Sequence, residues 1–428
     1  MSFREYLKNL RDNNLIVEIN DKTDLELSIT KQLQINKEKT TLFTDIKESN
    51  YQLIGNLLSS KDQLGEILET QNLYHNKFQG YVKNPKIPDK IESNPTFKNE
   101  ITVNLFELPI PKFFTSDGGR YLTAGIVFAK FPNSEEVNGS IHRIMIIGKD
   151  KGVIRLIPRD LYQIHEENSK SGKDTSIAII IGYHPAIALA ISFQQPYGES
   201  ELPLANSLMN GTLKTTKTPK YGIEIPAETE FVFEGKISAT ERHNEGPFVD
   251  ITGTKDTVRT QPTITIDKIY HRDNPIFQTI LPANKEHFIL MGFPREVQIY
   301  ERVSKIVKQV HGIYLTVGGC GWLHAVISIT PEKTRCTKNI GHAAFAAHPS
   351  LKWCTLVDKD IDIYNRKAVE WATITRAGEG DIVVINNVTG SSLDPSRNKT
   401  NNTTIKVIVD ATKKGEQKNE EYERIIPF

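Results

Sequence analysis

The feature that most constrains the fold is a long central region of short, β-branched strands. Between about residues 113 and 285, segments such as TAGIVFAKF, SIHRIMIIG, GVIRLI and TITIDKIYHR follow one another with turn residues between them. Many short strands with such punctuation indicate a β-barrel or a β-sandwich. A helix-like insert at 160–172 and an apolar run at 175–193 interrupt the pattern, and they are expected to pack against the strands.

The regions before and after this central part alternate helices with strands. Ser2 and Glu5 form a capping box that opens an amphipathic helix, and two short strands, TTLFTDI and YQLIGNLL, follow it. A stretch rich in proline, lysine and asparagine at 81–100 marks a crossing segment or a domain border. Pro294 is expected to open a helix with one apolar face, after which strands and helices alternate again.

We therefore expect a multidomain α+β protein. At 428 residues the chain is long enough for two or three domains with substantial cores. The predicted parts are an N-terminal α/β domain at 1–112, a central domain of β-strands at 113–293, and a C-terminal α/β domain at 294–428 that begins with a linking helix.

The charge balance argues against large anionic partners. Lysine and arginine number 53 against 52 acidic residues, so neither nucleic acid nor a membrane is expected as a partner, and any anionic ligand needs a local cluster. The apolar run at 175–193 contains Gly182 and Pro185, which predict a strand, a turn and a helix instead of a membrane span. The first residues lack the apolar core of a signal peptide, and the three cysteines form no C-x-x-C pair. A cytoplasmic protein without a disulfide framework is expected.

Two motifs fit known binding patterns poorly. The acidic segment at 358–370 has the spacing of a calcium loop, but Ile363 and Val369 stand where that loop needs glycine and glutamate. A polar turn after a strand is favoured there. The GGCGWLH segment follows neither the P-loop nor the dinucleotide spacing and favours a tight turn. The alternative is a nucleophilic Cys320, which has no evident base beside it.

The stretch ATERHNEGPFVDITG, residues 239–253, concentrates ionisable side chains around a Gly-Pro pair. Such an irregular segment is either a solvated loop between strands or a proton-handling site. Upstream, Arg143 begins an expected apolar strand in which Ile141 and Arg143 share one face. An inward Arg143 needs an anionic partner, which Glu245 or Asp250 could supply, because an unpaired buried charge is costly. The alternative is a rim arginine bonded to a backbone carbonyl.

Taken in order, these segments resemble the UbiD family of decarboxylases, which use prenylated FMN. The most specific stretches are NGSIHR, SELPLA, IPAETEFVFEGKI and EGPFVDITG, and the resemblance extends to at least GSSLDPS at 390–396. A finer similarity is to the archaeal branch of the family that acts in a modified mevalonate pathway. It is carried by EHFILMGFPREVQIYE, GGCGWLHAVISI and HPSLKWCTLVDKDIDIY. The resemblance implies that residues 113–293 form a split β-barrel, similar to that of flavin reductases, which binds the cofactor, and that the C-terminal domain oligomerises.

The resemblance also implies a set of site residues. Glu245, Arg143 and Asp250 match the catalytic Glu-Arg-acid trio, with Glu245 as the acid–base residue and Asp250 as its partner. Asn138 and Glu201 match the ligands of a divalent metal that bridges to the cofactor phosphate, and hard oxygen ligands favour Mn²⁺ or Mg²⁺. The positions that match cofactor contacts are Ser140, Ile141, His142, Arg143, Arg155, Leu156, Ile157 and Arg159.

One position departs from the family pattern. Some members place a metal-binding histidine after Pro-Arg or Pro-Gln, where this chain has Asp160. Either Asp160 is a third, carboxylate ligand or the metal keeps two protein ligands. The implied cofactors are prenylated FMN and Mn²⁺ or Mg²⁺, with K⁺ as an optional further ion. The implied partners are a small unsaturated acid, a flavin prenyltransferase that supplies the cofactor, and further copies of the chain in a homo-oligomer.

Three functions are compatible with these residues. The archaeal resemblance favours decarboxylation of trans-anhydromevalonate phosphate to isopentenyl phosphate. The second function is the same chemistry on an aromatic acid such as a polyprenyl-hydroxybenzoate, and the third is a flavin-binding subunit without catalysis. Intact Arg143, Glu245 and Asp250 argue against the third, because a binding subunit needs no such trio. A cationic pocket would favour the first substrate and an apolar channel the second.

Overall fold

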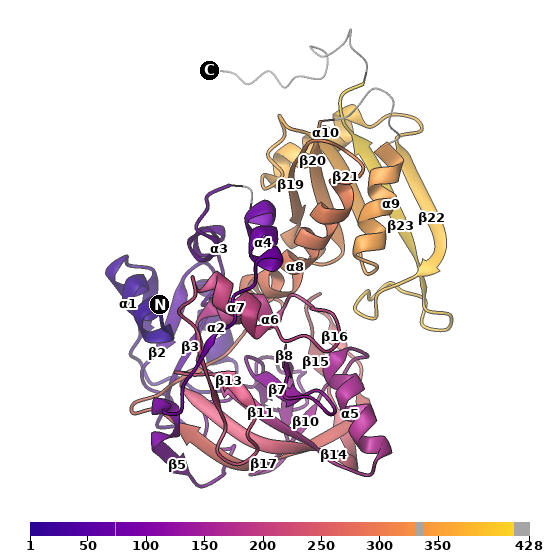
Figure 1. Cartoon of the computed structure of the whole chain (residues 1–428). Helices are drawn as coiled ribbons and strands as arrows, with labels where there is room; N and C mark the ends of the chain where they lie inside the picture. The colour runs from indigo at the N-terminus through magenta and orange to yellow at the C-terminus, as the bar shows by residue number, and fades with distance from the viewer. Residues whose placement is uncertain (73, 331–336, 415–428) are drawn as a thin grey trace. The chain divides into compact units, whose positions relative to one another are not determined.

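The structure is a computed structural model that describes residues 1–72, 74–330 and 337–414. Helices and strands are both abundant (Figure 1), and the expected multidomain α+β class is confirmed. The chain divides into two structural units. The first comprises residues 1–71, 80–250 and 255–290, and the second comprises residues 72–79, 251–254 and those from 291 onward. The borders expected near residues 112 and 293 remain predictions.

The first unit begins with a helix that the sequence predicts. The Ser2 hydroxyl accepts a hydrogen bond from the Glu5 N–H, and the Glu5 carboxylate accepts one from the Ser2 N–H, so the capping box is confirmed. One face of α1 (Phe3–Asp12) is buried. The apolar cluster on that face includes Leu42 and Ile54 from a four-stranded sheet. In spatial order this sheet contains β1 (Ile16–Ile19), β2 (Thr40–Phe43), β3 (Gln52–Gly55) and β18 (Ile276–Gln278).

The central region forms a nine-stranded antiparallel sheet around the largest apolar core. Its path runs β6 (Tyr121–Leu122), β9 (Ile144–Ile146), β10 (Lys151–Ile154), β17 (Arg259–His271), β14 (Phe231–Glu245), β11 (Thr175–Ile181), β7 (Ile126–Lys130) and β8 (Val137–Ile141), with β5 (Asn99–Ile101) also paired to β17. The strands expected in this region from their β-branched pattern are therefore present. A two-stranded hairpin, β15 (Phe248–Val249) with β16 (Lys255–Asp256), follows β14.

The expectation of one continuous strand through SIHRIMIIG is wrong. β8 ends at Ile141 and pairs with β7, whereas β9 begins at Ile144 and pairs with β6 and β10. His142 and Arg143 lie where the chain changes partners. The break is bridged by hydrogen bonds from the His142 N–H to Gly125 O and from the Arg155 N–H to Arg143 O, both 3.2 Å. Arg143 thus lies in the break between β8 and β9. The alternation of side chains along a continuous strand therefore does not determine where its side chain points.

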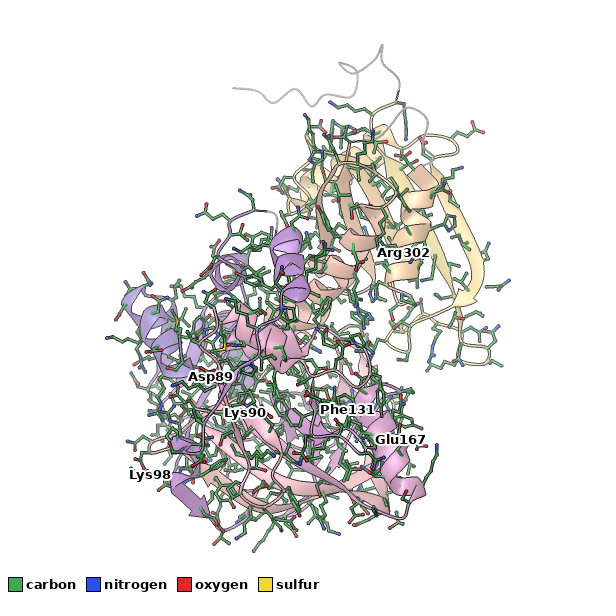
Figure 2. The ribbon with its side chains drawn as sticks, viewed as in Figure 1. Asp89, Lys90, Lys98, Phe131, Glu167 and Arg302 are labelled. Atoms are coloured by element: carbon green, nitrogen blue, oxygen red, sulfur yellow. The ribbon has the colours of Figure 1, made fainter. Side chains whose placement is uncertain are left out.

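Helices accompany the sheet at the two interruptions that the sequence indicates. The insert is α5 (Asp160–Lys170), and the apolar run is β11, a turn and α6 (Pro185–Ile191), as expected. Figure 2 shows Glu167 on α5, whose carboxylate accepts a hydrogen bond from the Tyr197 hydroxyl at 2.9 Å. The other elements of this unit are α2 (Ser28–Ile35), α3 (Lys61–Leu68), β4 (Asp89–Lys90), η1 (Pro95–Lys98), α7 (Leu202–Leu208), β12 (Lys214–Lys217) and β13 (Glu224–Pro226).

Two helices contain residues of both units. They are α4 (Tyr74–Lys83) and α8 (Lys285–Val303). Pro294 lies inside α8 and does not open it, so that expectation is wrong. A proline within a helix removes one backbone hydrogen bond, but an apolar face that is buried can compensate for the loss. Leu290, Phe293 and Val297 of α8 are all buried.

The second unit contains a five-stranded sheet with helices that bury its apolar residues. Its order is β19 (Val310–Leu315), β20 (His324–Ile329), β21 (Trp353–Asp358), β23 (Thr403–Ala411) and β22 (Ile382–Thr389). Residues of α9 (Thr337–Ala347) belong to one apolar cluster and residues of α10 (Arg366–Arg376) to another. A short 3₁₀ turn, η2 (Val317–Gly319), stands in the glycine-rich segment. The sequence pattern missed β23, although it is the only strand paired to β22 among the described residues.

None of the helices in the three described ranges combines the length and the apolar character that a bilayer crossing requires.

Candidate active site

The acidic stretch at 239–253 divides into the end of a strand, a Gly-Pro turn and a hairpin. β14 continues to Glu245, so the expectation of an irregular loop is wrong for the first half of the stretch. The side chains of residues 240–244 are exposed, whereas Glu245 has a relative exposure of 0%. In the pairing of β14 with β17, Glu245 lies opposite Arg259. A solvated loop therefore does not describe the position of Glu245.

The turn after Glu245 is held from behind by a neighbouring backbone segment. Gly246 has φ +102°, a conformation that favours glycine. The Gly118 N–H donates to Pro247 O at 2.8 Å, and a Cβ on Gly118 would lie 2.4 Å from the Gly246 carbonyl oxygen. Asp117 accepts a hydrogen bond from the Val249 N–H at 3.1 Å. These contacts fix the backbone on which the acidic side chains stand.

Arg143 is the centre of a cluster of three carboxylates. Its Nε and Nη2 donate to the two carboxylate oxygens of Glu245 at 2.9 and 2.8 Å, a bidentate pair. Its Nη1 donates to Asp250 at 2.5 Å, and Nη2 also donates to Asp256 at 3.0 Å. The guanidinium carbon lies 4.6 Å from the centre of the Phe248 ring. The structure thus brings together the three residues that the sequence proposes as a catalytic trio, and adds a fourth.

The cluster keeps its arginine charged. Burial opposes the charge, but the hydrogen bonds and charges of Glu245, Asp250 and Asp256 dominate, and the pKa of Arg143 is raised. Burial also disfavours the ionised form of Asp256, yet the Arg259 and Arg143 guanidiniums hold the pKa of Asp256 below its ordinary value. Asp256 and Arg143 therefore form a fixed pair of opposite charges.

Sequence analysis missed Asp256. It stands on β16 opposite Phe248 of β15, within the hairpin that follows Glu245. It lies in the segment TKDTVR, which comes directly after EGPFVDITG. Pairing of the two short strands turns Asp256 back toward Arg143, and this pairing leaves little periodic signal in so few residues.

A second buried carboxylate, Glu201, lies at the N-cap of α7 with a relative exposure of 2%. Its oxygens accept hydrogen bonds from the Asn138 amide at 3.2 Å and from the Gly139 N–H at 2.9 Å. Burial, together with the charge of Asp160, raises the pKa of Glu201 to about 8, and burial also raises the pKa of Asp160. The three proposed metal ligands are therefore brought near one another. Among the described residues no cationic side chain forms an ion pair with Glu201, and the charge of Arg159 acts on Asp160.

His142 and Ser140 form a chain of hydrogen bonds close to these acids. The His142 Nδ1 lies 3.0 Å from Arg155 O, which can only accept, so Nδ1 carries the proton and Nε2 accepts from the Ser140 hydroxyl at 2.9 Å. The Ser140 hydroxyl also lies 3.3 Å from the Asn138 amide oxygen. Burial lowers the pKa of His142 to about 4, so the imidazole is neutral at physiological pH.

Arg155 and Arg159 supply positive charge next to this chain. Burial lowers the pKa of both guanidiniums, and in the described ranges no carboxylate forms an ion pair with either. The Arg155 guanidinium donates to Leu156 O at 2.9 Å. Leu156 is buried and donates its N–H to Gln261, whereas Ile157 is 38% exposed. The loss of solvent is only partial, because Arg155 is half-buried and the residue Arg159 is exposed beside Asp160. Guanidiniums that form no ion pair within the described ranges are suited to an anionic ligand.

The donor set fits a phosphate-bearing cofactor held with a divalent ion. Within the described residues there is no cluster of three or more histidine, cysteine, aspartate or glutamate side chains with metal-site geometry. A metal here must therefore use the amide oxygen of Asn138 beside Glu201 and Asp160, all hard oxygen donors. An external cation would balance the two acids, and a phosphate would balance Arg155 and Arg159.

The other candidates from the sequence do not form a site. Burial raises the pKa of the Cys320 thiol, which donates to Thr252 O at 3.8 Å, so a reactive thiolate is not favoured. In the acidic segment at 358–370, which has the spacing of a calcium loop, Asp358 and Asp360 form ion pairs with the buried Arg376. That segment is a polar turn after β21, as expected.

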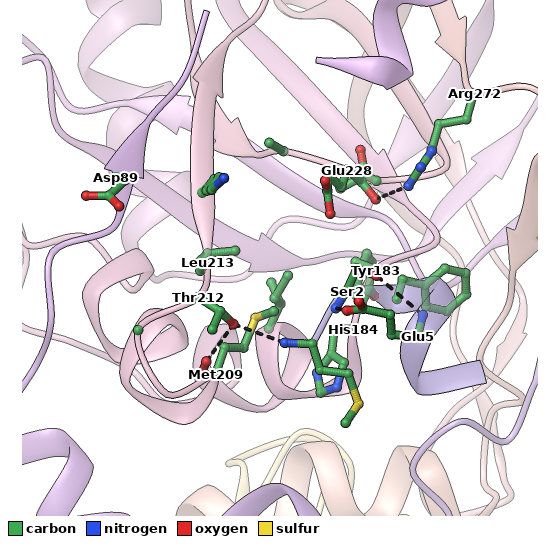
Figure 3. A pocket seen from close by; sticks show the side chains of 17 residues that line it. Ser2, Glu5, Asp89, Tyr183, His184, Met209, Thr212, Leu213, Glu228 and Arg272 are labelled. Carbon is green, nitrogen blue, oxygen red and sulfur yellow. Dashed lines mark hydrogen bonds between the residues drawn. The ribbon is translucent and has the colours of Figure 1, made fainter. Parts of the chain in front are cut away.

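A cavity of about 570 Å³ lies in the first unit and contains none of the predicted site residues. It is lined by residues that include Ser2, Tyr183 and Arg272 (Figure 3). His184, also in its lining, caps α6 by accepting from the Ala186 N–H at 3.2 Å, and burial lowers the pKa of His184 to about 3. Its lining contains neither Arg143 nor the acids that contact Arg143, so the cavity is separate from the Arg143 cluster.

The antiparallel sheet carries a buried acid–arginine cluster and a set of donors suited to a metal and a phosphate. Together they define a cofactor-dependent enzyme that moves a proton. The Rift-related domain of 3-octaprenyl-4-hydroxybenzoate carboxy-lyase matches residues 89–285, and the N-terminal and C-terminal domains of the same enzyme type match residues 7–77 and 288–411. The chain therefore belongs to the UbiD family of carboxy-lyases.

Relatives and solved structures agree with this family over the whole chain. The anhydromevalonate phosphate decarboxylase of Methanosarcina mazei is 40% identical over 429 residues, which cover 100% of this chain and 99% of the relative. The enzyme of the same name from Methanothermobacter thermautotrophicus is 35% identical over 412 residues, 96% of each chain. The UbiD-class enzyme HmfF from Pelotomaculum thermopropionicum, in complex with FMN, superimposes with a TM-score of 0.96. It is 30% identical and covers 100% of this chain and 97% of its own.

Proposed function

We propose that this protein decarboxylates trans-anhydromevalonate phosphate to isopentenyl phosphate and CO₂, with prenylated FMN and Mn²⁺ or Mg²⁺ as cofactors. The observation that carries the proposal is Glu245, a fully buried carboxylate gripped on both oxygens by Arg143. The choice of substrate is supported by the archaeal relatives named anhydromevalonate phosphate decarboxylase. The choice of cofactor is supported by HmfF, which has been solved with FMN and, in an evolved form, with prFMN.

Glu245 would supply the proton that completes the reaction. Prenylated FMN, when bound, provides the electron-accepting framework that makes loss of CO₂ possible. Breaking the bond to the carboxylate leaves an electron pair on a substrate carbon, which must be protonated. Glu245 is the acid placed to donate that proton, and a positioned acid is worth about 10²–10⁴-fold in rate. Arg143 orients Glu245, and Asp250 holds Arg143 from the other side.

The donors on the other side of Arg143 would hold the cofactor. Asn138, Glu201 and Asp160 are the proposed metal ligands. Arg155 and Arg159 would hold the cofactor phosphate, since neither guanidinium forms an ion pair with a carboxylate among the described residues. The proposed contacts of Ser140, Ile141, His142, Leu156 and Ile157 with the cofactor complete this set.

Decarboxylation of an aromatic acid is the second candidate. Phenolic acid decarboxylases of Bacillus subtilis and Sedimentibacter hydroxybenzoicus are each 28% identical to this chain across 96% of its length. The two candidates share the Glu245 chemistry and differ in what holds the rest of the substrate. The higher identity of the archaeal relatives favours the phosphate-bearing acid.

Product analysis tests the proposal. The protein is produced together with a flavin prenyltransferase and incubated separately with trans-anhydromevalonate phosphate and with an aromatic acid. The expected result is CO₂ and isopentenyl phosphate from the first acid only, and none from protein produced without the prenyltransferase. Turnover of aromatic acids alone would replace the first candidate by the second, and bound flavin without any turnover would favour a non-catalytic subunit.

The proposal includes a cytoplasmic homo-oligomer that receives its cofactor from a flavin prenyltransferase. An evolved dimeric form of HmfF supports association between copies of the chain. Light scattering on the purified protein gives the oligomeric state, and a monomer at micromolar concentration would contradict this part. A K⁺ ion, the optional third component, is tested by assaying turnover with Na⁺ in its place.

A further inference from the structure

We propose that Asp256 and Arg259 are a positioning pair that keeps Arg143 aligned with Glu245 while Glu245 gains and loses its proton. The inference rests on the proposed function, because it concerns the protonation step. It adds two residues outside the Glu245–Arg143–Asp250 trio. Neither needs to touch substrate or cofactor, so both act through Arg143.

Hydrogen-bond geometry connects the pair to the arginine. Arg143 Nη2 donates to Glu245 at 2.8 Å and to Asp256 at 3.0 Å, so the two acids share one nitrogen. The same Asp256 oxygen accepts from Arg259 Nη1 at 2.6 Å. Arg259 also donates to the Thr257 carbonyl oxygen at 3.2 Å. Asp256 therefore lies between two guanidiniums, and its place is set from both sides.

The strand register closes these contacts into a ring. Arg259 lies opposite Glu245 in the pairing of β14 with β17. Asp256 lies opposite Phe248 in the hairpin, and Arg143 packs over the Phe248 ring. The side-chain contacts run from Glu245 to Arg143, then to Asp256 and on to Arg259. Because Arg259 is paired with Glu245 across β14 and β17, these contacts begin and end on the same pair of strands. A shift of Arg143 away from Glu245 would thus break contacts on both paths.

The charges explain why such a ring is needed. When Glu245 is ionised, it, Asp250 and Asp256 carry three negative charges against the two of Arg143 and Arg259. When Glu245 holds a proton its hydrogen bonds to Arg143 lose their charge assistance and weaken. Asp250 and Asp256 then keep Arg143 in place, and the five side chains are electrically balanced. Asp256 and Arg259 thus keep Arg143 in position when Glu245 is protonated, which is when Glu245 holds Arg143 most weakly.

Substitution of Asp256 gives the principal test. In Asp256→Asn, turnover under saturating substrate should fall roughly 10- to 100-fold, as expected when a reacting group is misplaced by a fraction of an ångström to an ångström. KM and the occupancy of cofactor and metal should stay within about threefold of the wild type, because Asp256 is not among the residues proposed to hold the cofactor or the metal. Arg259→Gln should lower turnover less, and Arg259→Lys, which retains one charged donor for Asp256, should recover part of the loss.

The double variant separates position from charge. Asp256→Asn with Arg259→Gln removes one negative and one positive charge, so the charge balance of the cluster is unchanged. If position matters, the double variant should be as slow as Asp256→Asn alone, because both substitutions remove one contact chain. A return to the wild-type rate would show that only charge matters and would overturn the proposal.

A matched control measures the effect of losing a paired aspartate on β17, the strand that carries Arg259. Asp267 on β17 forms an ion pair with Lys220 at 3.1 Å and a hydrogen bond with Tyr221. Asp267→Asn should leave turnover within about twofold of the wild type. Two results would overturn the proposal: turnover of Asp256→Asn within twofold of the wild type, or equal losses of turnover, cofactor occupancy and melting temperature in both variants.

A structural readout keeps the test independent of the proposed function. If the wild-type protein releases no CO₂ from either acid, the proposed function fails, and the position of Arg143 is then compared in crystal structures of the wild type and Asp256→Asn. Rotation of the guanidinium away from its bidentate pair with Glu245 would support the positioning role. An unmoved Arg143 would overturn it.

Discussion

Glu245 and Glu201 are both buried carboxylates of the first unit, but they are stabilised in different ways. Glu245 lies against Arg143, which donates to both of its oxygens. Glu201 receives hydrogen bonds from neutral donors, the Asn138 amide and the Gly139 N–H, and its neighbour Asp160 is another acid. Glu245 is thus paired with an arginine, whereas no cationic side chain of the described residues forms an ion pair with Glu201.

The difference teaches what each carboxylate is able to do. A carboxylate that already has a fixed arginine can exchange a proton without a large rearrangement of charge around it. A buried carboxylate without a cation holds a proton unless a cation enters, because burial penalises the ionised form. The same residue type is thus suited to acid–base chemistry at the end of β14 and to metal binding at the N-cap of α7.

The largest expected effect comes from removing the acid of the arginine site. Glu245→Gln keeps the size of the side chain but cannot donate the proton, so turnover should fall about 10²- to 10⁴-fold. Cofactor and metal occupancy should be unchanged. Steady-state rates and mass spectrometry measure the two quantities.

Glu234→Gln is the matched control for this variant. Glu234 is also fully buried on β14, but it accepts hydrogen bonds from the Lys220 and Tyr221 N–H groups and has no part in the cluster. Turnover of the Glu234→Gln variant should stay near the wild-type rate. Near-normal turnover of Glu245→Gln would remove the acid–base role from this site.

Removing the other carboxylate should have the opposite pattern. Glu201→Ala takes a carboxylate from the proposed metal site and should weaken metal and cofactor binding by roughly 2–5 kcal/mol, as for other broken buried charge pairs. Metal analysis and mass spectrometry of the purified variant should find both ligands depleted, in contrast to Glu245→Gln. Full occupancy of metal and cofactor in Glu201→Ala would contradict the assignment.

A third buried carboxylate, Glu286, forms no ion pair among the described residues and is held by backbone hydrogen bonds. It is 2% exposed, and burial raises its pKa to about 8 despite hydrogen bonding from backbone donors such as the Leu58 N–H. Because the folded pKa exceeds the unfolded value, the stabilisation is present at low pH and is lost as pH rises toward 8 and above. Between about pH 6 and pH 8 the free energy of unfolding should decrease by on the order of 1–3 kcal/mol from this group.

The isosteric variant isolates this effect. Glu286→Gln cannot ionise, so its free energy of unfolding should change less over the same pH range than that of the wild type. Urea unfolding at several pH values gives the comparison. Parallel pH curves for the two proteins would mean that Glu286 keeps an ordinary pKa.

The smallest expected effect concerns the second acid of the trio. Asp250 contacts Arg143 through one nitrogen, whereas Glu245 engages two, so Asp250→Asn should weaken the hold on Arg143 without removing the proton donor. Turnover should fall roughly tenfold, about 1.4 kcal/mol of barrier. A variant far slower than Glu245→Gln would exchange the roles of the two acids.

Much of the fold could be predicted because its signals are local. The capping box at Ser2 and the strand–turn–helix at 175–193 depend on neighbouring residues, and both are confirmed. The prediction that Pro294 opens a helix was wrong. Proline opens many helices, but burial of the apolar face on both sides of Pro294 allows α8 to continue through it. β23 was missed because an exposed polar stretch precedes it and its pairing with β21 comes from far along the chain.

The grouping of the acidic residues with Arg143 could be predicted from family motifs, but not from the periodicity of the sequence. Arg143 and Glu245 are 102 residues apart, and no periodicity brings them together. Family motifs placed them in one trio, but they did not include Asp256, whose position depends on how a two-residue strand pairs. The strand break at His142 and Arg143 was also hidden, because its letters alternate as a continuous strand would.

The place of Glu245 at the end of a 15-residue strand bears on how the protein opens. Amides in the paired ends of β14 and β17 can exchange with solvent only when that pairing separates, so hydrogen exchange near Glu245 should require a large opening of the sheet. Fraying of the surrounding loops would not change the exchange of these amides. Mild heating or low denaturant should therefore leave the acid and its arginine together until the sheet itself unfolds, and loss of activity and loss of sheet structure should share one transition.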